Sequence, residues 1–271
     1  MIFAVPLYDD NPTARDPIVT YLLIGLCIGA FLWQSHFEPR EETAVLYTYG
    51  MVPARLFGLW HPRSAYQVVP SWATLLTSMF LHGGWFHLIG NMMFLWIFGN
   101  NIEDVLGRGR FMLFYLCCGV VAALTQALSS YGSHVPMVGA SGAIAGVLGA
   151  YLLLYPNANV HVFVWIIIFF RIVNIPAWIL LGLWFAMQLL SGLARAPGTP
   201  GVAFWAHIGG FVCGIILITL LRPWGLALMQ PRRSRGFAVV PPSSFVGRRT
   251  FHGGSVPPVG RPYRRRPGLW D

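Results

Sequence analysis

The uncharged stretch Ser141-Gly-Ala-Ile-Ala-Gly-Val-Leu-Gly-Ala-Tyr-Leu-Leu-Leu-Tyr155 repeats small residues at every fourth position. Ser141, Ala145 and Gly149 form one such row, and a second row begins at Gly142. Small residues at this spacing let helices approach closely inside a membrane, where packing and hydrogen bonds hold helices together. The stretch therefore predicts a short membrane helix packed tightly against a neighbour.

Composition places the whole chain in the membrane class. Of its 271 residues, 56% are hydrophobic and 10% are charged, and the mean hydropathy is +0.61. Soluble domains carry roughly 25% charged residues, and a transmembrane helix needs about 17–25 apolar residues. We therefore expect an all-α membrane protein, a six-helix bundle whose spans are residues 18–37, 85–102, 111–128, 141–155, 176–193 and 202–221.

The apolar run 160–170 is harder to interpret. It is too short to span and is followed by Arg171, Asn174 and Pro176. We interpret it as an interfacial or re-entrant segment. The alternative is a seventh span, which would place the C-terminus on the opposite side of the membrane.

Arginine positions set the expected orientation, because basic residues near span ends are retained in the cytoplasm. Arg108 follows the second expected span, Arg171 follows the fourth and Arg222 follows the sixth. All three fall on one side, so we expect both termini, including residues 1–17, in the cytoplasm and the loop 38–81 outside. We expect an integral multi-pass protein of a bacterial inner membrane.

The C-terminal segment 231–271 differs in composition from the rest. It is rich in Pro, Gly and Ser and carries nine of the 18 arginines. Such a segment cannot bury enough apolar surface to fold, so we expect a disordered cytoplasmic tail. Its charge favours contact with anionic lipid headgroups, and we expect no nucleic-acid partner.

Ser141 and His207 are polar residues within apolar segments. Counting residues along the expected helices places both at one depth in the membrane. The 15 residues of 141–155 make about 22 Å of helix, against a hydrocarbon core of roughly 30 Å. If the C-terminal end of this helix reaches the cytoplasmic face, Ser141 lies roughly 8 Å below the outer one. His207 follows the re-entry of the chain at Val202 by five residues and lies at a similar depth.

His87 and Asn91 share that depth near the outer end of the second expected span. At positions i and i+4 they lie on one helical face. Polar groups are costly in lipid, so these side chains are expected to face the protein interior and to mark a functional site. Gln126 and Gln188 are left as candidates for hydrogen bonds between helices.

These residue types support acyl transfer. A serine hydroxyl becomes nucleophilic when a neutral histidine takes its proton, which assigns Ser141 as nucleophile and His207 as base. His87, Asn91 and the Ser141 amide can stabilise the developing oxyanion. Because Glu103 and Asp104 are expected at the opposite membrane face, the inference is a dyad without a carboxylate.

At this point the chain resembles the rhomboid family of intramembrane serine proteases over roughly residues 6–224. The resemblance rests on five motifs in the family's order: His82, His87-Leu-Ile-Gly-Asn91, Glu103-Asp-Val-Leu-Gly107, Gly139-Ala-Ser-Gly142 and Ala206-His-Ile-Gly-Gly210.

The resemblance implies a six-helix protease domain over residues 18–224, built around a water-filled cavity that opens to the non-cytoplasmic side. It implies Ser141 as nucleophile, His207 as base and an oxyanion hole from His87 and Asn91. It also implies membrane-protein substrates cleaved in their transmembrane segments, with no cofactor and no metal. The supporting residues would be Gly139, Gly142, Gly210 and His82, the last a polar residue near the cavity mouth. The oligomeric state is not implied.

Two positions depart from the family pattern. Family members often carry Trp-Arg in the outer loop, whereas Trp72 is followed here by Ala73. Many also carry an aromatic residue four positions after the serine, stacked on the catalytic histidine, and that position is Ala145. Either another ring, such as Trp205 or Phe211, holds His207, or the imidazole is less firmly oriented.

Other interpretations compete with a protease. Ser141 alone could be a small packing residue. The chain could be an inactive rhomboid-like binder or chaperone of membrane proteins, or a transporter whose polar residues line a path. Zinc binding by His82 and His87 would depart from the His-Glu-X-X-His spacing of metalloproteases.

Overall fold

The structure is a computed structural model that describes residues 2–61, 68–166, 169–196 and 198–231. The chain divides into two units, Met1–Val240 and Pro241–Asp271. The tail predicted over 231–271 lies, from residue 232 onward, outside the described residues. Every helix and strand of the described residues lies in the first unit.

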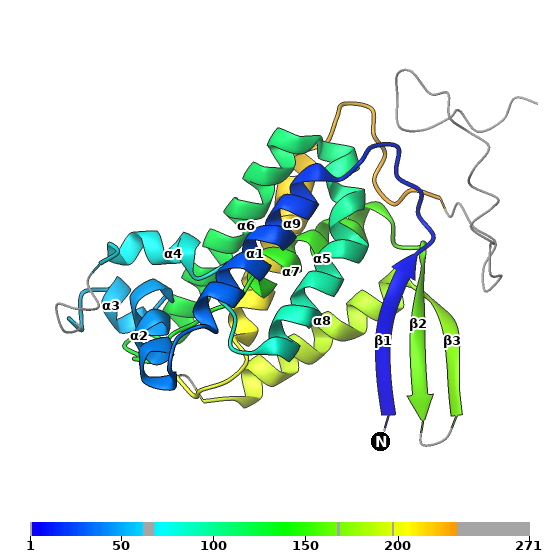
Figure 1. Cartoon of the computed structure of the whole chain (residues 1–271). Coiled ribbons are helices and arrows are strands. Elements are labelled where there is room, and N and C mark those ends of the chain that lie inside the picture. Colours follow the sequence, from blue (N-terminus) through cyan, green and yellow to red (C-terminus); the bar gives the residue numbers. More distant parts are fainter. Residues whose placement is uncertain (1, 62–67, 167–168, 197, 232–271) are drawn as a thin grey trace, which may run out of the picture. The chain divides into compact units, whose positions relative to one another are not determined.

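Long helices make up most of this unit (Figure 1). They occupy each range in which a span is expected: α1 (Ile18–Gln34), α5 (Trp85–Leu106), α6 (Arg108–Ser129), α7 (Ser141–Leu154), α8 (Ala177–Ala194) and α9 (Phe204–Leu221).

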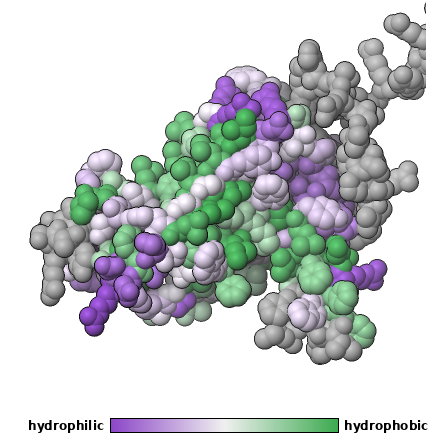
Figure 2. Space-filling model, viewed as in Figure 1, coloured by the Kyte–Doolittle hydropathy of each residue, from purple (hydrophilic) through white to green (hydrophobic). Residues whose placement is uncertain are grey.

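Three of these helices, α6, α8 and α9, are long and apolar enough to cross a membrane, and α1 and α7 are shorter apolar helices. Figure 2 shows hydrophobic residues over the middle of the helical part and hydrophilic residues toward its two ends. The chain is therefore a mostly helical membrane protein, while the count of six spans stays a prediction.

Helix α7 forms the centre of the bundle. Nearly all of its residues are buried, and it packs against α5, α6 and α9. A Cβ atom added to Gly214 of α9 would lie 1.9 Å from the carbonyl oxygen of Gly146, and one added to Gly149 would lie 2.3 Å from that of Phe211. Only glycine permits these approaches, so the small-residue rows of α7 bring it into backbone contact with α9.

The loop between α1 and α5 carries short helices. These are α2 (Pro39–Tyr49), α3 (Pro53–Leu56), a 3-10 turn η2 (Ser71–Ala73) and α4 (Thr74–Thr77). Buried Arg55 donates hydrogen bonds to the carbonyl oxygens of Tyr47 and Thr48. The charge of Arg55 is thus satisfied by backbone carbonyl groups, which join α3 to the end of α2.

A three-stranded antiparallel sheet departs from the all-α prediction (Figure 1). Its strands are β1 (Ile2–Asp9), β2 (Asn159–Ile166) and β3 (Phe169–Pro176), in the order β1-β2-β3. Described residues of the run 160–170 thus lie in β2 and β3, a structure that the all-α prediction did not include, while the position of the run as interfacial, re-entrant or spanning stays a prediction. β-branched and aromatic residues fill this run, and such residues favour strands.

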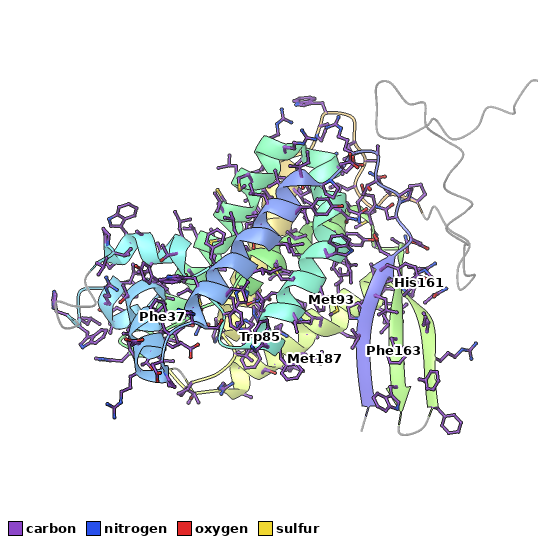
Figure 3. All side chains as sticks on the ribbon, viewed as in Figure 1. Phe37, Trp85, Met93, His161, Phe163 and Met187 are labelled. Atoms are coloured by element: carbon purple, nitrogen blue, oxygen red, sulfur yellow. The ribbon has the colours of Figure 1, made fainter. Side chains whose placement is uncertain are left out.

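Buried polar contacts fix the sheet to the helices. The Asp9 carboxylate of β1 accepts hydrogen bonds from the Tyr151 hydroxyl of α7 (2.5 Å) and from Asn101 Nδ2 of α5 (2.9 Å). The ring of His161, labelled on β2 in Figure 3, stacks on that of Tyr8 with centroids 4.2 Å apart. The N-terminal strand is thus linked to the helix that begins at Ser141.

Glu103 performs a comparable role for α1. Its carboxylate accepts hydrogen bonds from the backbone N–H groups of Val19 and Thr20 and from the Thr20 hydroxyl. These N–H groups belong to the first turn of α1 and have no partner within the helix. Glu103 therefore caps α1 from α5, as a structural residue.

Replacing Gly214 by alanine tests the contact between α7 and α9. The added Cβ would overlap the Gly146 backbone, so we expect Gly214→Ala to destabilise the fold by about 1–3 kcal/mol. Thermal unfolding in detergent measures this. Gly182→Ala on α8 is the matched control, because its Cβ meets no atom within 4 Å and the helix gains propensity. Equal melting temperatures for the two variants would contradict the packing described.

Asp9 predicts a pH dependence of stability. Burial raises its pKa from 3.8 to about 7, and Asp10 adds to the shift, while the hydrogen bonds from Tyr151 and Asn101 oppose it. Between about pH 4 and pH 7 the folded protein keeps a proton that the unfolded chain has lost, so this group's contribution to stability falls as the pH rises through that window.

The measurement is the melting temperature of wild type minus that of Asp9→Asn, whose side chain does not titrate. This difference should become more negative from pH 5 to pH 8. The control is Asp16→Asn, at an exposed carboxylate. A difference that stays constant, or that rises with pH, would contradict the raised pKa of Asp9 in the folded protein.

Candidate active site

Ser141 and His207 meet where α7 packs against α9. Ser141 is the first residue of α7, and His207 lies in the first turn of α9. The Ser141 Oγ atom lies 2.7 Å from His207 Nε2, within hydrogen-bond distance. His207 is buried and Ser141 is partly buried.

Glycines set this distance. A Cβ on Gly210 would lie 2.0 Å from the Gly142 carbonyl oxygen, and a Cβ on Gly142 would lie 2.6 Å from the Cβ of Ala122 in α6. Both glycines therefore act by allowing the helices that carry Ser141 and His207 to touch. Gly142 and Gly210, the two glycines predicted as supporting residues, thus contribute close packing between α6, α7 and α9.

His87 and Asn91 approach the same point from α5. His87 Nδ1 accepts a hydrogen bond from the Gly83 N–H (3.3 Å), which leaves the proton of a neutral ring on Nε2 as a donor. Within the described part of the chain, the buried Asn91 Nδ2 has no hydrogen-bond partner. Two side-chain donors are thus available beside Ser141.

Gly139 makes room for these donors. Its φ of +125° lies in a region that favours glycine. A Cβ there would lie 2.8 Å from His87 Nε2 and 3.7 Å from Asn91 Nδ2. Any larger residue would press on the His87 ring, so Gly139 keeps the space in front of both donors open.

One cavity of about 600 Å³ joins these groups. Its lining includes Ser141, His207, His87 and Asn91, together with Gln126. The four residues predicted to form the site are thus brought together around a single space. That the cavity holds water and opens to the outer side of the membrane stays a prediction.

His82 lies behind this site and does not line the cavity. Its side chain is fully buried, its Nδ1 atom lies 3.2 Å from the Phe80 carbonyl oxygen, and its ring centroid is 5.2 Å from that of His87. Gln34 of α1 donates to the His82 carbonyl oxygen and accepts from its N–H. His82 therefore packs against His87 from the protein interior, away from the cavity mouth expected for it.

The described residues contain no group of three or more His, Cys, Asp or Glu side chains that could hold a metal ion.

Helix α8 supplies two contacts to His207 whose roles the sequence did not assign. Gln188 Oε1 lies 2.8 Å from His207 Nδ1, and the Trp184 ring lies 5.7 Å from the His207 ring, tilted by 36°. The ring beside His207 is thus Trp184, in place of the expected Trp205 or Phe211. The only signal in the sequence is a glutamine within an apolar helix, four residues after a tryptophan.

Comparisons with known proteins identify the family of this chain. Residues 69–224, which include every residue of the candidate site, match the family profile of the Rhomboid domain. Among similar proteins, Rhomboid protein 1, mitochondrial, of Saccharomyces cerevisiae is 25% identical over 77% of this chain and 65% of its own length. RHOMBOID-like protein 6, mitochondrial, of Arabidopsis thaliana is 31% identical over 85% of this chain and 66% of its own length.

A bacterial relative, Rhomboid protease GluP of Bacillus subtilis, is 35% identical over 50% of this chain and 24% of its own length. The chain spans about half to two thirds of the length of the relatives it matches most extensively. Relatives named as mitochondrial stand beside bacterial ones, so the comparisons do not support the prediction of a bacterial inner membrane.

The profile match covers more than half of the chain, and the relatives share the rhomboid name across bacteria, fungi and plants. With the motifs in order on packed apolar helices, these findings establish that the chain belongs to the rhomboid family.

Proposed function

We propose that this protein is an intramembrane serine endopeptidase that cleaves membrane-protein substrates through a Ser141–His207 dyad. The observation that carries the proposal is the 2.7 Å contact between Ser141 Oγ and His207 Nε2 on a cavity of about 600 Å³. Relatives named as rhomboid proteases, such as GluP, support the same class of reaction.

The reaction begins with proton transfer from Ser141 to His207. The serine oxygen attacks the carbonyl carbon of the scissile peptide bond while Nε2 takes the hydroxyl proton. His207 then gives that proton to the leaving amine, and the C–N bond breaks to leave an acyl-enzyme. A water molecule, activated by the same imidazole, hydrolyses the ester and restores Ser141.

Three donors stabilise the oxyanion that forms on the carbonyl oxygen. They are the Asn91 amide, the His87 Nε2–H and the backbone N–H of Ser141, which has no partner within α7 because it lies in the first turn. Donors fixed in advance are worth far more in a buried site than in water. The partnerless Asn91 Nδ2 among the described residues fits this role.

Substrate helices reach the cavity laterally, between α5 and α8. Phe86 and Phe94 of α5 and Trp184 of α8 all line the cavity, so both helices border the space in which the peptide bond must enter. Helix α8 buries only Ala177, Leu181 and Gly192, which makes its remaining surface available to lipid or to a substrate.

The arginine pattern favours both termini on the cytoplasmic side.

Covalent labelling tests the proposed nucleophile. A fluorophosphonate should modify the wild type and leave Ser141→Ala unmodified, because only a serine with a neighbouring base attacks the probe. Ser133→Ala is the matched control, since Ser133 lines the same cavity but its Oγ accepts a hydrogen bond from Val135 N–H instead of contacting histidine. In-gel fluorescence and mass spectrometry measure the modification.

The control variant should be labelled as strongly as the wild type. Absence of labelling in well-folded wild type would overturn the protease and favour a rhomboid-like protein that binds membrane clients without cleaving them. Equal labelling of Ser141→Ala would place the nucleophile elsewhere.

A further inference from the structure

We propose that Gln188 is a positioning residue that holds His207 in the tautomer able to accept the Ser141 proton. This inference rests on the proposed protease function. It adds Gln188 to the Ser141–His207 dyad as a residue that orients the imidazole. Helix α8 thereby supplies the orienting group that a carboxylate supplies in other serine hydrolases.

The imidazole of His207 is bridged on both nitrogens. Nε2 lies 2.7 Å from Ser141 Oγ on α7, and Nδ1 lies 2.8 Å from Gln188 Oε1 on α8. Both distances fall within the normal hydrogen-bond range. The ring therefore spans the gap between two helices that it does not belong to.

Hydrogen-bond roles decide the tautomer. A neutral imidazole has one N–H donor and one acceptor nitrogen. When the amide oxygen of Gln188 faces Nδ1, the proton must reside on Nδ1, and the lone pair of Nε2 then faces the serine hydroxyl. If an amide N–H faced Nδ1, the ring proton would lie on Nε2 and His207 could not act as a base toward Ser141.

The Gln188 oxygen also serves the second half of the reaction. After His207 takes the serine proton, both ring nitrogens carry N–H groups, and the one on Nδ1 still has its acceptor. A neutral amide stabilises this imidazolium less than a carboxylate does, so the ring returns its proton readily to the leaving amine. Gln188 thus substitutes for an acid in orientation but not in charge.

Trp184 shares the α8 face with Gln188, four residues away. Its ring packs 5.7 Å from that of His207 and 6.1 Å from that of Phe211. The amide thereby fixes the rotation of the imidazole, while the indole limits its tilt. Together they restrain the His207 ring. In many members of the family that the chain resembles, an aromatic residue at the position of Ala145 has this role.

The membrane setting argues that this glutamine has a specific partner. Gln188 is half-buried in a helix whose other large side chains are apolar, and an unsatisfied amide in that setting is costly. A purely structural hydrogen bond between α8 and α9 would satisfy the same need. The experiment must therefore measure the protonation and tautomer of His207 as well as the stability of the protein.

The test compares Gln188→Met, Gln188→Glu and wild type in cleavage of a transmembrane peptide in proteoliposomes. Methionine keeps the size but lacks the acceptor, so we expect kcat about 10- to 100-fold lower, with KM within about twofold, because general-base assistance is impaired. Glutamate keeps an oxygen acceptor and should restore most of the rate. Met187→Leu, at the exposed neighbouring position, is the control and should be unchanged.

The pH–rate profile adds a readout that a structural bond would not move. A carboxylate at 188 favours the imidazolium, so the acidic limb of Gln188→Glu should move to higher pH by about one unit or more. Of the residues that line the cavity, the other titratable side chain is His87, and it is present in all variants.

Nitrogen-15 NMR of histidine-labelled protein gives the tautomer directly. His207 should carry its proton on Nδ1 in wild type and in Gln188→Glu, and populate both tautomers in Gln188→Met. Wild-type kcat in Gln188→Met, or a rate for Gln188→Glu no better than for Gln188→Met, would overturn the role of Gln188 alone. Undiminished cleavage by Ser141→Ala would instead overturn the Ser141–His207 dyad on which this inference rests.

Discussion

Backbone contact between α7 and α9 is the constraint on which the rest of the structure depends. In a membrane, apolar helices gain no hydrophobic free energy when they exchange lipid contacts for contacts with one another. They therefore associate where their surfaces pack closely. Here the fit is made by glycine against glycine, with Gly210 and Gly214 of α9 facing the backbone of Gly142 and Gly146 in α7. The same contact fixes the distance between Ser141 and His207, so fold and candidate chemistry share one cause.

The third helix at this contact, α6, uses small residues for the same reason. A Cβ on Gly146 would lie 2.5 Å from the Cys118 sulfur, and one on Gly142 would overlap Ala122. α7 is therefore enclosed on both sides, while α8 remains largely exposed. His207, the proposed base, thus lies between two closely packed helices and a helix with little burial of its own, so its orientation depends on the position of α8.

The helix positions could be predicted because a long apolar run in a membrane satisfies its backbone hydrogen bonds within itself by forming a helix. The sheet could not be predicted in this way, because the pairing of β1 with β2 joins residues 151 to 164 positions apart and leaves no local signal. The run 160–170 is too short for a span, while its β-branched and aromatic residues favour strands. Asp9, its partner Tyr151 and the linkage of the N-terminus to α7 were missed for the same reason.

The site was more predictable than the sheet, because depth along each helix can be counted. Counting placed Ser141, His207, His87 and Asn91 at one level, and the structure brings all four to one cavity. Counting cannot show which face of α8 turns toward α9, so the sequence alone assigns no partner to Gln188 and does not single out Trp184. Relative rotation of helices depends on the whole packed bundle.

The central claim is that His207 is the base for Ser141, and the most direct measurement is the single-turnover rate of cleavage of a transmembrane substrate in proteoliposomes by purified His207→Ala. We predict that this variant keeps the wild-type melting behaviour and substrate affinity but loses cleavage by at least about 10³-fold, as expected when the base of an activated serine is removed. A rate equal to that of the wild type would contradict the dyad and, with it, the account given of the site.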